Sequence, residues 1–136
     1  MATSSELSLV FWTEPFFKHA EDLLNNDPSL AGTLAGIETS ILLRCDKRDE
    51  SFMIKLASGR VATKLAGPQD KTEFTLSASY DECVKIAMGE EKVQREIVRG
   101  KVKFTGSWPK MLLYINKVVR LENEMLGKIR LMAIRY

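Results

Sequence analysis

The chain has 136 residues, 45% of them hydrophobic, and a formal net charge of +2. This length predicts one domain over residues 1–136 with a single core. No run reaches the roughly 18 apolar residues of a membrane span, and no basic segment precedes the apolar residues near the N-terminus. These absences argue against membrane insertion and export, and they favour a cytoplasmic location.

The charge is distributed unevenly along the chain. Residues 1–98 carry 11 Lys and Arg against 16 Asp and Glu, whereas residues 99–136 carry 9 against 2. A basic C-terminal third can attract an anionic membrane, a phosphate or a coenzyme A moiety, although a solvated helix face is the simpler interpretation. The basic residues form no compact block, so nucleic-acid binding is not expected.

Two helices are predicted in the first third of the chain. Thr13-Glu14-Pro15 is typical of a helix start, with a capping hydroxyl and a proline in the first turn. Apolar residues then follow at helical spacing as far as Leu24, and the helix is expected to end near Asn26. Residues 27–34 predict a short helical turn that ends at Gly36.

Four alternating segments follow, at residues 37–45, 52–56, 61–65 and 74–78. The charged residues 46–50, the pair Ser58-Gly59 and the pair Gly67-Pro68 separate them as turns. Short strands joined by tight turns predict an antiparallel meander with one polar face, which requires helices to cover the other face.

The second half predicts two short helices, a strand and a long helix. Ser79-Tyr80-Asp81-Glu82 fits a capping box that begins a helix ending at Gly89, and a second helix runs from about Glu91 to Gly100. In residues 101–105 Val102 and Phe104 alternate with polar neighbours, which predicts a strand. Residues 107–109 then begin a helix, whereas the tail from residue 123 is ambiguous because Gly127 interrupts its helical spacing.

This last helix carries a continuous apolar stripe. Side chains spaced three or four apart form it: Trp108, Met111 or Leu112, Ile115, Val118 or Val119, and then Glu122. So much apolar surface requires either a solid core or a ligand. The methionines of this half are compatible with both, because a thioether adapts to ligand shape and also fills ordinary cores.

Residues for catalysis or metal binding do not form any known pattern. His19 is the only histidine, and Cys45 and Cys83 have no CxxC spacing, so we expect free buried thiols, no metal site and no disulfide. The glutamates at 82, 90, 91 and 96 are interpreted as caps and solvated charges. No phosphate-binding glycine loop occurs. We therefore expect no catalytic residues, no cofactor and no enzymatic activity.

Three segments carry a resemblance to a known family. Gly100-Lys101-Val102-Lys103-Phe104-Thr105-Gly106 has the form of a glycine-bounded strand that precedes a helix of leucines and methionines. The segment Tyr80–Gly89 has the form of a short helix ending in a small residue and glycine, and Asn26–Gly36 has the form of an approach to the first strand. In these features the chain resembles, over nearly its whole length, the sterol carrier protein type-two family of lipid-binding domains.

The resemblance implies an α+β fold, in which helices cover one face of an antiparallel five-stranded sheet and leave an apolar tunnel between. Such a tunnel holds a sterol, fatty acid, fatty acyl-coenzyme A or phospholipid without chemistry. The peroxisomal signal and the fused enzymes of many eukaryotic members are absent, so the chain resembles a free-standing prokaryotic member. The residues expected to line the tunnel are Val84, Ala87, Met88, Val93, Ile97, Phe104, Trp108, Met111, Leu112 and Ile115.

Two further functions stay open at this point. The helix face can instead pair with another subunit, such as an enzyme that acts on acyl groups, which would show as contiguous exposed apolar surface. An enzyme with a carboxylate in an α+β pocket would need an acidic side chain pointing into the cavity, and the inward strand positions contain none. The oligomeric state is not predicted.

Overall fold

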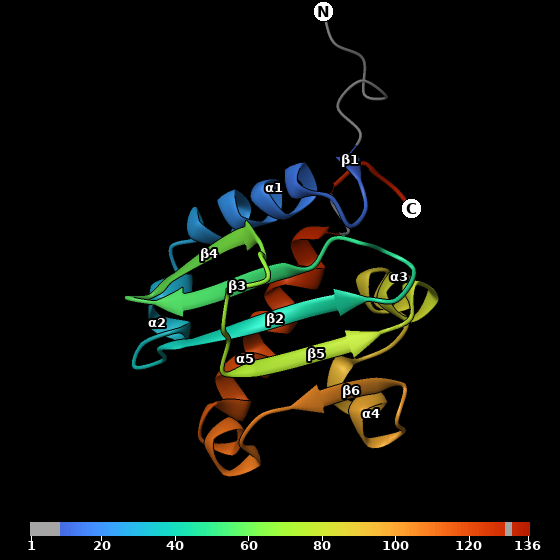
Figure 1. Ribbon diagram of the computed structural model, residues 1–136. Helices are drawn as coiled ribbons and strands as arrows, with labels where there is room; N and C mark the ends of the chain where they lie inside the picture. The colour runs from blue at the N-terminus through green and yellow to red at the C-terminus, as the bar shows by residue number, and fades with distance from the viewer. Residues whose placement is uncertain (1–8, 130–131) are drawn as a thin grey trace, which may run out of the picture.

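The computed structural model describes residues 9–129 and 132–136, and its main feature is a five-stranded sheet (Figure 1). The spatial order is β4-β3-β2-β5-β6, which confirms the predicted five-stranded α+β class. A separate parallel pair joins β1 (Leu9–Val10) to β7 (Ile134–Arg135). The strands of the main sheet are β2 (Thr39–Cys45), β3 (Phe52–Ala57), β4 (Arg60–Leu65), β5 (Phe74–Ala78) and β6 (Val102–Thr105).

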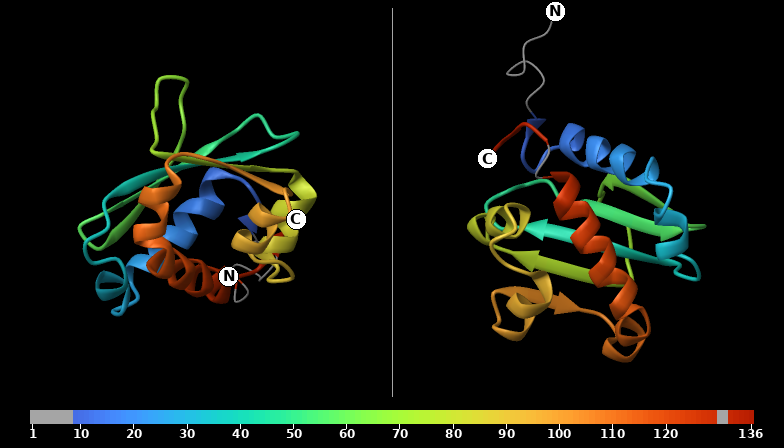
Figure 2. Two further views of the ribbon diagram at one scale, coloured as in Figure 1. Left: turned by 90° about the horizontal axis from the view of Figure 1, so that it is seen from below. Right: turned by 180° about the vertical axis from the view of Figure 1, so that it is seen from behind.

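The described helices lie on one side of this sheet (Figure 2). They are α1 (Glu14–Asn25), α2 (Leu30–Thr33), α3 (Tyr80–Ala87), α4 (Val93–Val98) and α5 (Trp108–Ile129). Helix α5 crosses the sheet and α1 runs along its β4 edge, while α3 and α4 stand beside one end of it (Figure 2). None of the helices in the described ranges combines the length and the apolar character that a membrane crossing requires.

One strand pairing differs from the predicted meander. Strand β5 pairs in parallel with β2, placing Phe74 opposite Ile41, instead of joining β4. The outer edge of β4 is already occupied, because Asn25 of α1 exchanges two hydrogen bonds of 2.8 and 2.9 Å with the backbone of Val61. Glu21 likewise accepts from the Thr63 amide. Residues 66–73 therefore carry the chain past β3 and β2 before β5 begins (Figure 1).

The predicted helix starts are partly correct. Ser79 accepts a hydrogen bond of 3.1 Å from the Glu82 amide at the start of α3, as the capping box predicts. At α1 the proline lies in the first turn, but the Thr13 hydroxyl donates to the Val10 carbonyl at 2.6 Å instead of capping the helix. The ambiguous tail is helical to Ile129, despite Gly127, and ends in β7.

Gly106 determines how closely α5 can follow β6. Its φ of +137° is a backbone conformation that side chains with a Cβ rarely adopt. A Cβ at this position would lie 2.5 Å from Cδ1 of Phe74 and 2.8 Å from the carbonyl oxygen of Glu73. The glycine therefore lets the β6–α5 connection contact β5 directly, which brings the start of α5 over this edge of the sheet.

Candidate functional site

Three of the predicted lining residues meet over strands β2, β5 and β6. Phe104 of β6 and Met111 and Ile115 of α5 share an apolar cluster with the buried Ile41 and Phe74. Leu43, Leu76 and Val118 pack against the same cluster. Met111, not Leu112, is the buried alternative at this turn of α5, since Leu112 is exposed. The structure thus brings three of the ten predicted residues together in one apolar cluster.

An aromatic row connects this cluster with the protein surface. The ring centroids of Phe74 and Phe104 are 5.6 Å apart, and those of Phe104 and Trp108 are 4.3 Å apart with 30° between planes. Phe74 is buried, Phe104 is half-buried and Trp108 is 47% exposed. The row therefore leads outward from the core to an indole that water reaches.

The helices cover this part of the inner sheet face incompletely. Leu76, Phe104, Ile115 and Val118 point into the space between the layers, yet each stays only half-buried. Helix α4 and the first turns of α5 stand at opposite ends of β6 (Figure 2).

The other predicted residues lie in a second group or on the surface. Ala87 and Met88 line a small cavity of about 240 Å³ beside the C-terminal end of α5. Val84 packs against the aromatic cluster near α1, and Val93 and Ile97 are half-buried on α4. The structure therefore does not place all ten residues around one described cavity. The remaining lining residues of the small cavity are Ile129, Met132, Ile134 and Tyr136.

A larger groove was missed by the sequence analysis. Its volume is about 730 Å³, and Tyr114 is its only contribution from α5. Gly59 at the β3–β4 turn forms part of its wall, and a Cβ there would lie 3.1 Å from the Cα of Ala31. The sequence marked this region only by the Ser58-Gly59 turn and by the short helix that ends at Gly36, and neither indicates a groove. The other lining residues are Ala31, Ala35, Gly36, Ile37, Glu38 and Ser58.

Polar contacts join the start of α4 to the middle of α5. The Val93 amide donates to Oε2 of Glu122 at 3.1 Å, and Nζ of Lys92 donates to Oδ1 of Asn123 at 3.0 Å. Burial raises the pKa of Glu122, while the Val93 hydrogen bond and the charge of Lys92 oppose that rise. These contacts link α4 to α5 near Glu122 and so form a polar border beside the apolar cluster.

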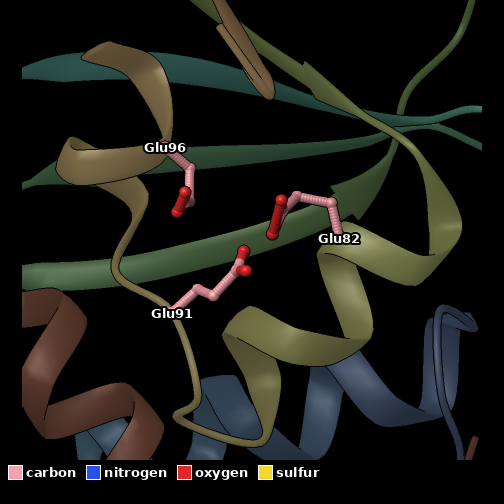
Figure 3. A group of neighbouring side chains, drawn as sticks. All are labelled: Glu82, Glu91 and Glu96. Atoms are coloured by element: carbon pink, nitrogen blue, oxygen red, sulfur yellow. The ribbon is translucent and has the colours of Figure 1, made fainter. Parts of the chain in front are cut away.

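The interpretation of the glutamates as caps and solvated charges is wrong for Glu82 and Glu96. They are 5% and 0% exposed, and their carboxylates point toward Glu91 (Figure 3). Glu90 is exposed, as expected. The pattern missed the two buried glutamates because glutamate at a helix start is ordinarily a solvated partner of the helix dipole.

The cysteines are free, as predicted. Cys45 is buried and Cys83 is half-buried. Burial raises the pKa of Cys83 to about 12 and also raises the pKa of Cys45. Both thiols are therefore protonated at neutral pH, and neither has the lowered pKa of a reactive cysteine. His19 is exposed on α1.

The SCP-2 sterol transfer family matches residues 17–116, so the chain belongs to that family. This confirms the resemblance seen in the sequence. Lipid binding or transfer in general follows from membership, and the family fold is a non-catalytic one. Comparison with curated protein sequences finds no match.

Solved structures share this fold at low sequence identity. A crystal structure of sterol carrier protein 2 has a TM-score of 0.74 and 15% identity, covering 90% of this chain and 99% of that one. A conserved hypothetical protein from Thermus thermophilus, possibly a sterol carrier protein, has a TM-score of 0.73 and 12% identity, with coverage of 88% and 89%. A UbiJ-SCP2 ubiquinone synthesis protein has a TM-score of 0.58 and 15% identity, with coverage of 82% and 93%.

Proposed function

We propose that the protein binds a single lipid over β5 and β6, between α4 and α5, and transfers it without chemistry. The observation that carries this proposal is the half-buried layer formed by Leu76, Phe104, Ile115 and Val118. An acyl chain or sterol laid on this layer removes apolar surface from water, at about 0.8 kcal/mol per buried methylene. Such a site needs few polar contacts, so we expect it to accept sterols, fatty acids, fatty acyl-coenzyme A and phospholipids.

Trp108 offers a direct test, because it lies at the outer end of the aromatic row. The other tryptophan, Trp12, is buried and its indole donates to the Glu50 carbonyl at 2.9 Å. In a Trp12→Phe variant the emission reports only on Trp108. We expect a dansyl-labelled fatty acid to quench this emission by energy transfer, and unlabelled palmitate or cholesterol to restore it. No quenching at micromolar protein, together with no lipid retained in native mass spectrometry, would contradict the proposal.

A pair of variants on α5 separates lipid binding from simple stability. Ile115 is half-buried in the apolar layer, whereas Leu113 on the same helix is 81% exposed. We expect Ile115→Trp to fill the space and weaken probe binding at least ten-fold, with a smaller loss of thermal stability. Leu113→Trp should bind the probe like the wild type. Equal losses of binding and stability in Ile115→Trp would indicate a solid core.

We also propose that lipid exchange involves an anionic bilayer. The bilayer contacts the face of the sheet opposite the described helices, called the bare face because only the connection at residues 66–73 crosses it (Figure 1). The outward positions of the five strands carry basic side chains and no Asp or Glu. One of these side chains, Lys64, is paired with Asp70 at 2.9 Å. The exposed basic residues on this face are Arg44, Lys55, Arg60, Lys64 and Lys103.

The basic C-terminal third contributes little to this surface. Lys110 pairs with Glu73, Lys117 donates to the Ala35 carbonyl, and Lys101 faces Glu82 and Glu91. Of the lysines in that third, Lys103 is the one that joins the bare face. The other exposed basic residues of this face, Arg44, Lys55, Arg60 and Lys64, come from strands earlier in the chain.

Vesicle binding tests this bare face. Phosphatidylglycerol vesicles should bind the protein and phosphatidylcholine vesicles should not. A basic side chain near such a surface contributes about 1 kcal/mol, so Lys55→Gln with Lys103→Gln should weaken binding about 30-fold. Lys85→Gln with Arg95→Gln removes the same charge from exposed positions on the helix side and should have little effect. Equal effects of the two pairs, or no vesicle binding, would refute the assignment; preference for an acidic protein or a nucleic acid would identify a different partner.

A second candidate function, an accessory subunit, is favoured by the start of α5. Leu112 and Leu113 are 60% and 81% exposed, and Leu112 lies one helical turn after the half-exposed Trp108. They form a small apolar surface for another protein subunit, such as an enzyme that acts on acyl groups. The similarity to a UbiJ-SCP2 ubiquinone synthesis protein also keeps this function open. Light scattering should distinguish the functions, because a monomer that retains lipid contradicts the subunit-pairing function.

A further inference from the structure

Three glutamates from consecutive segments converge beside the apolar layer. Glu82 comes from α3, Glu91 from the α3–α4 connection and Glu96 from α4, and their carboxylates point toward one another (Figure 3). One carboxylate oxygen from each lies within 4.8 Å of the others. Glu96 is fully buried and Glu82 is 5% exposed. Bringing these negative charges together away from water is costly unless a cation or a proton compensates them.

The positive side chains nearby compensate this cluster only in part. Nζ of Lys101 lies 3.5 Å from Oε1 of Glu91 and 4.0 Å from Oε1 of Glu82, and Nη1 of Arg99 lies 3.4 Å from Oε1 of Glu96. Both cationic side chains are about half-exposed. The Oε2 atoms of all three glutamates are buried and have no hydrogen-bond partner among the described residues. Each of these unpartnered oxygens is a free electron-pair donor.

We propose that Glu82, Glu91 and Glu96 bind one divalent cation that prefers oxygen ligands, with Ca²⁺ as the best fit. Carboxylate oxygens around Ca²⁺ lie at about 2.3–2.6 Å from the ion, so two ligands of one ion are at most about 5.2 Å apart. The three carboxylate oxygens all lie within 4.8 Å of one another, which is inside this limit. The cluster contains no nitrogen or sulfur ligand, which disfavours zinc and copper.

Lys101 acts in this proposal as a competitor for the ion. Its ammonium group lies near two of the three carboxylates, yet the side chain is 49% exposed and has room to swing into water. With the site empty, Lys101 partly neutralises the cluster; with the ion bound, it leaves. The bound ion would connect α3 to α4, and so it would brace one border of the proposed lipid site.

No metal site is expected from the sequence, because it lacks the histidine and cysteine spacing that is typical of such sites. Carboxylate ligands spaced nine and five residues apart have no recognisable pattern, and glutamates are common on exposed helices. The buried positions of Glu82 and Glu96 appear only in the folded chain. The proposal is independent of lipid binding, since the ion and the lipid occupy different groups of side chains.

Mn²⁺ titration of the EDTA-treated full chain, followed by electron paramagnetic resonance without lipid, tests the proposal. We expect one Mn²⁺ per chain with sub-millimolar affinity, displaced by Ca²⁺. Glu96→Gln should weaken binding at least ten-fold, whereas Glu90→Gln changes an exposed neighbour and should leave it unchanged. Lys101→Met should strengthen binding several-fold, and Lys103→Met, which removes an exposed lysine of β6 that forms no ion pair with these glutamates, should not.

The wild-type titration alone can overturn the proposal, whether or not a variant folds. No Mn²⁺ bound at millimolar concentration would show that the carboxylates share a proton or rely on Lys101. If Glu96→Gln fails to fold by circular dichroism, Glu91→Gln at the half-buried position replaces it. Wild-type affinity in a folded Glu96→Gln or Glu91→Gln variant would place the ion elsewhere and overturn the proposal as well.

Discussion

The inner face of the sheet has two halves that are covered to different degrees. On β3, Phe52 and Leu56 are both 0% exposed, and Phe17 of α1 stacks on Phe52 with centroids 4.2 Å apart. On β5 and β6, Phe74 and Val102 are buried, but Leu76 and Phe104 face the same side and stay half-buried. All these strands have the same alternating pattern, so alternation shows which residues face inward and not how well they are covered. We propose that a lipid completes the core at the half-buried Leu76 and Phe104.

The largest expected effect tests the packed half. Phe52→Ala removes a fully buried ring and leaves a cavity, so we expect a loss of about 3–5 kcal/mol in the free energy of unfolding. Urea denaturation measures the loss. Binding of the labelled fatty acid to the remaining folded protein should be unchanged. A loss below about 1 kcal/mol would show that the two halves are equally loosely packed.

A smaller loss is expected where β6 meets α5. Gly106→Ala forces a Cβ into a positive-φ conformation and into contact with Phe74, so we expect about 2–3 kcal/mol of destabilisation. Gly127→Ala is the matched control, because a Cβ there meets nothing within 4 Å and helix propensity favours alanine by about 1 kcal/mol. Thermal and urea unfolding of both variants give the comparison. A neutral Gly106→Ala would mean that the connection can move away from β5.

On the half-covered side, a substitution should weaken lipid binding more than it lowers stability. On the packed side we expect the reverse. Phe104 is only half-buried, so Phe104→Ala should cost about 1–2 kcal/mol, roughly half the cost of a buried phenylalanine. Its effect on the labelled fatty acid should be larger, at least a ten-fold loss of affinity, because the ring separates Phe74 from Trp108. The free energy of unfolding and the affinity for the labelled fatty acid, measured on one preparation, test both expectations. Wild-type affinity would remove Phe104 from the lipid site.

The smallest expected effects are pH-dependent changes in stability, and they have opposite signs at Asp27 and at Glu122. Asp27 accepts from the amide and hydroxyl of Ser29 and pairs with Lys128, which lowers the pKa of Asp27 from 3.8 to about 2. This stabilisation is present at neutral pH and is lost as the pH falls from about 4 to 2. Burial raises the pKa of Glu122 above 4.5, so its charged form destabilises the fold once the pH rises through that raised pKa.

Replacing each carboxylate by its amide tests these two opposite effects on stability. Asp27→Asn should lower the melting temperature at pH 7 and have almost no effect near pH 2. Glu122→Gln keeps an oxygen that accepts from the Val93 amide, so it should raise the melting temperature at pH 7 and have little effect below pH 4. Calorimetric scans over pH 2–8 measure both. Equal signs at pH 7 would contradict the assignment of Glu122 to a desolvated position.

Much of the secondary structure was predictable because local patterns determine it. The strand at residues 102–105, the helix that begins at Trp108 and the Ser79 cap are all where the sequence places them. The parallel β2–β5 pairing was not predictable, since strand alternation carries no information on the neighbouring strand. Asn25 and Glu21 occupy the edge of β4 only once α1 has docked there.

The candidate site also has features that were predictable from the sequence and features that were not. Phe104, Met111 and Ile115 were predictable as one wall, because period-two and period-3.6 spacing place them on inward faces. The partial burial of that wall was not predictable, because burial depends on where α4 and α5 lie relative to each other. Leu112 illustrates the limit, since one helical step separates it from the buried Met111 and leaves it exposed.

The sequence by itself determined the family, the helices and strands, and the direction in which each alternating side chain faces, because these depend on spacing and on motifs only a few residues long. Only the tertiary structure decided the strand order, the half-covered layer over β5 and β6, the bare basic face and the convergence of Glu82, Glu91 and Glu96. Those features depend on contacts between distant segments, which no local pattern encodes.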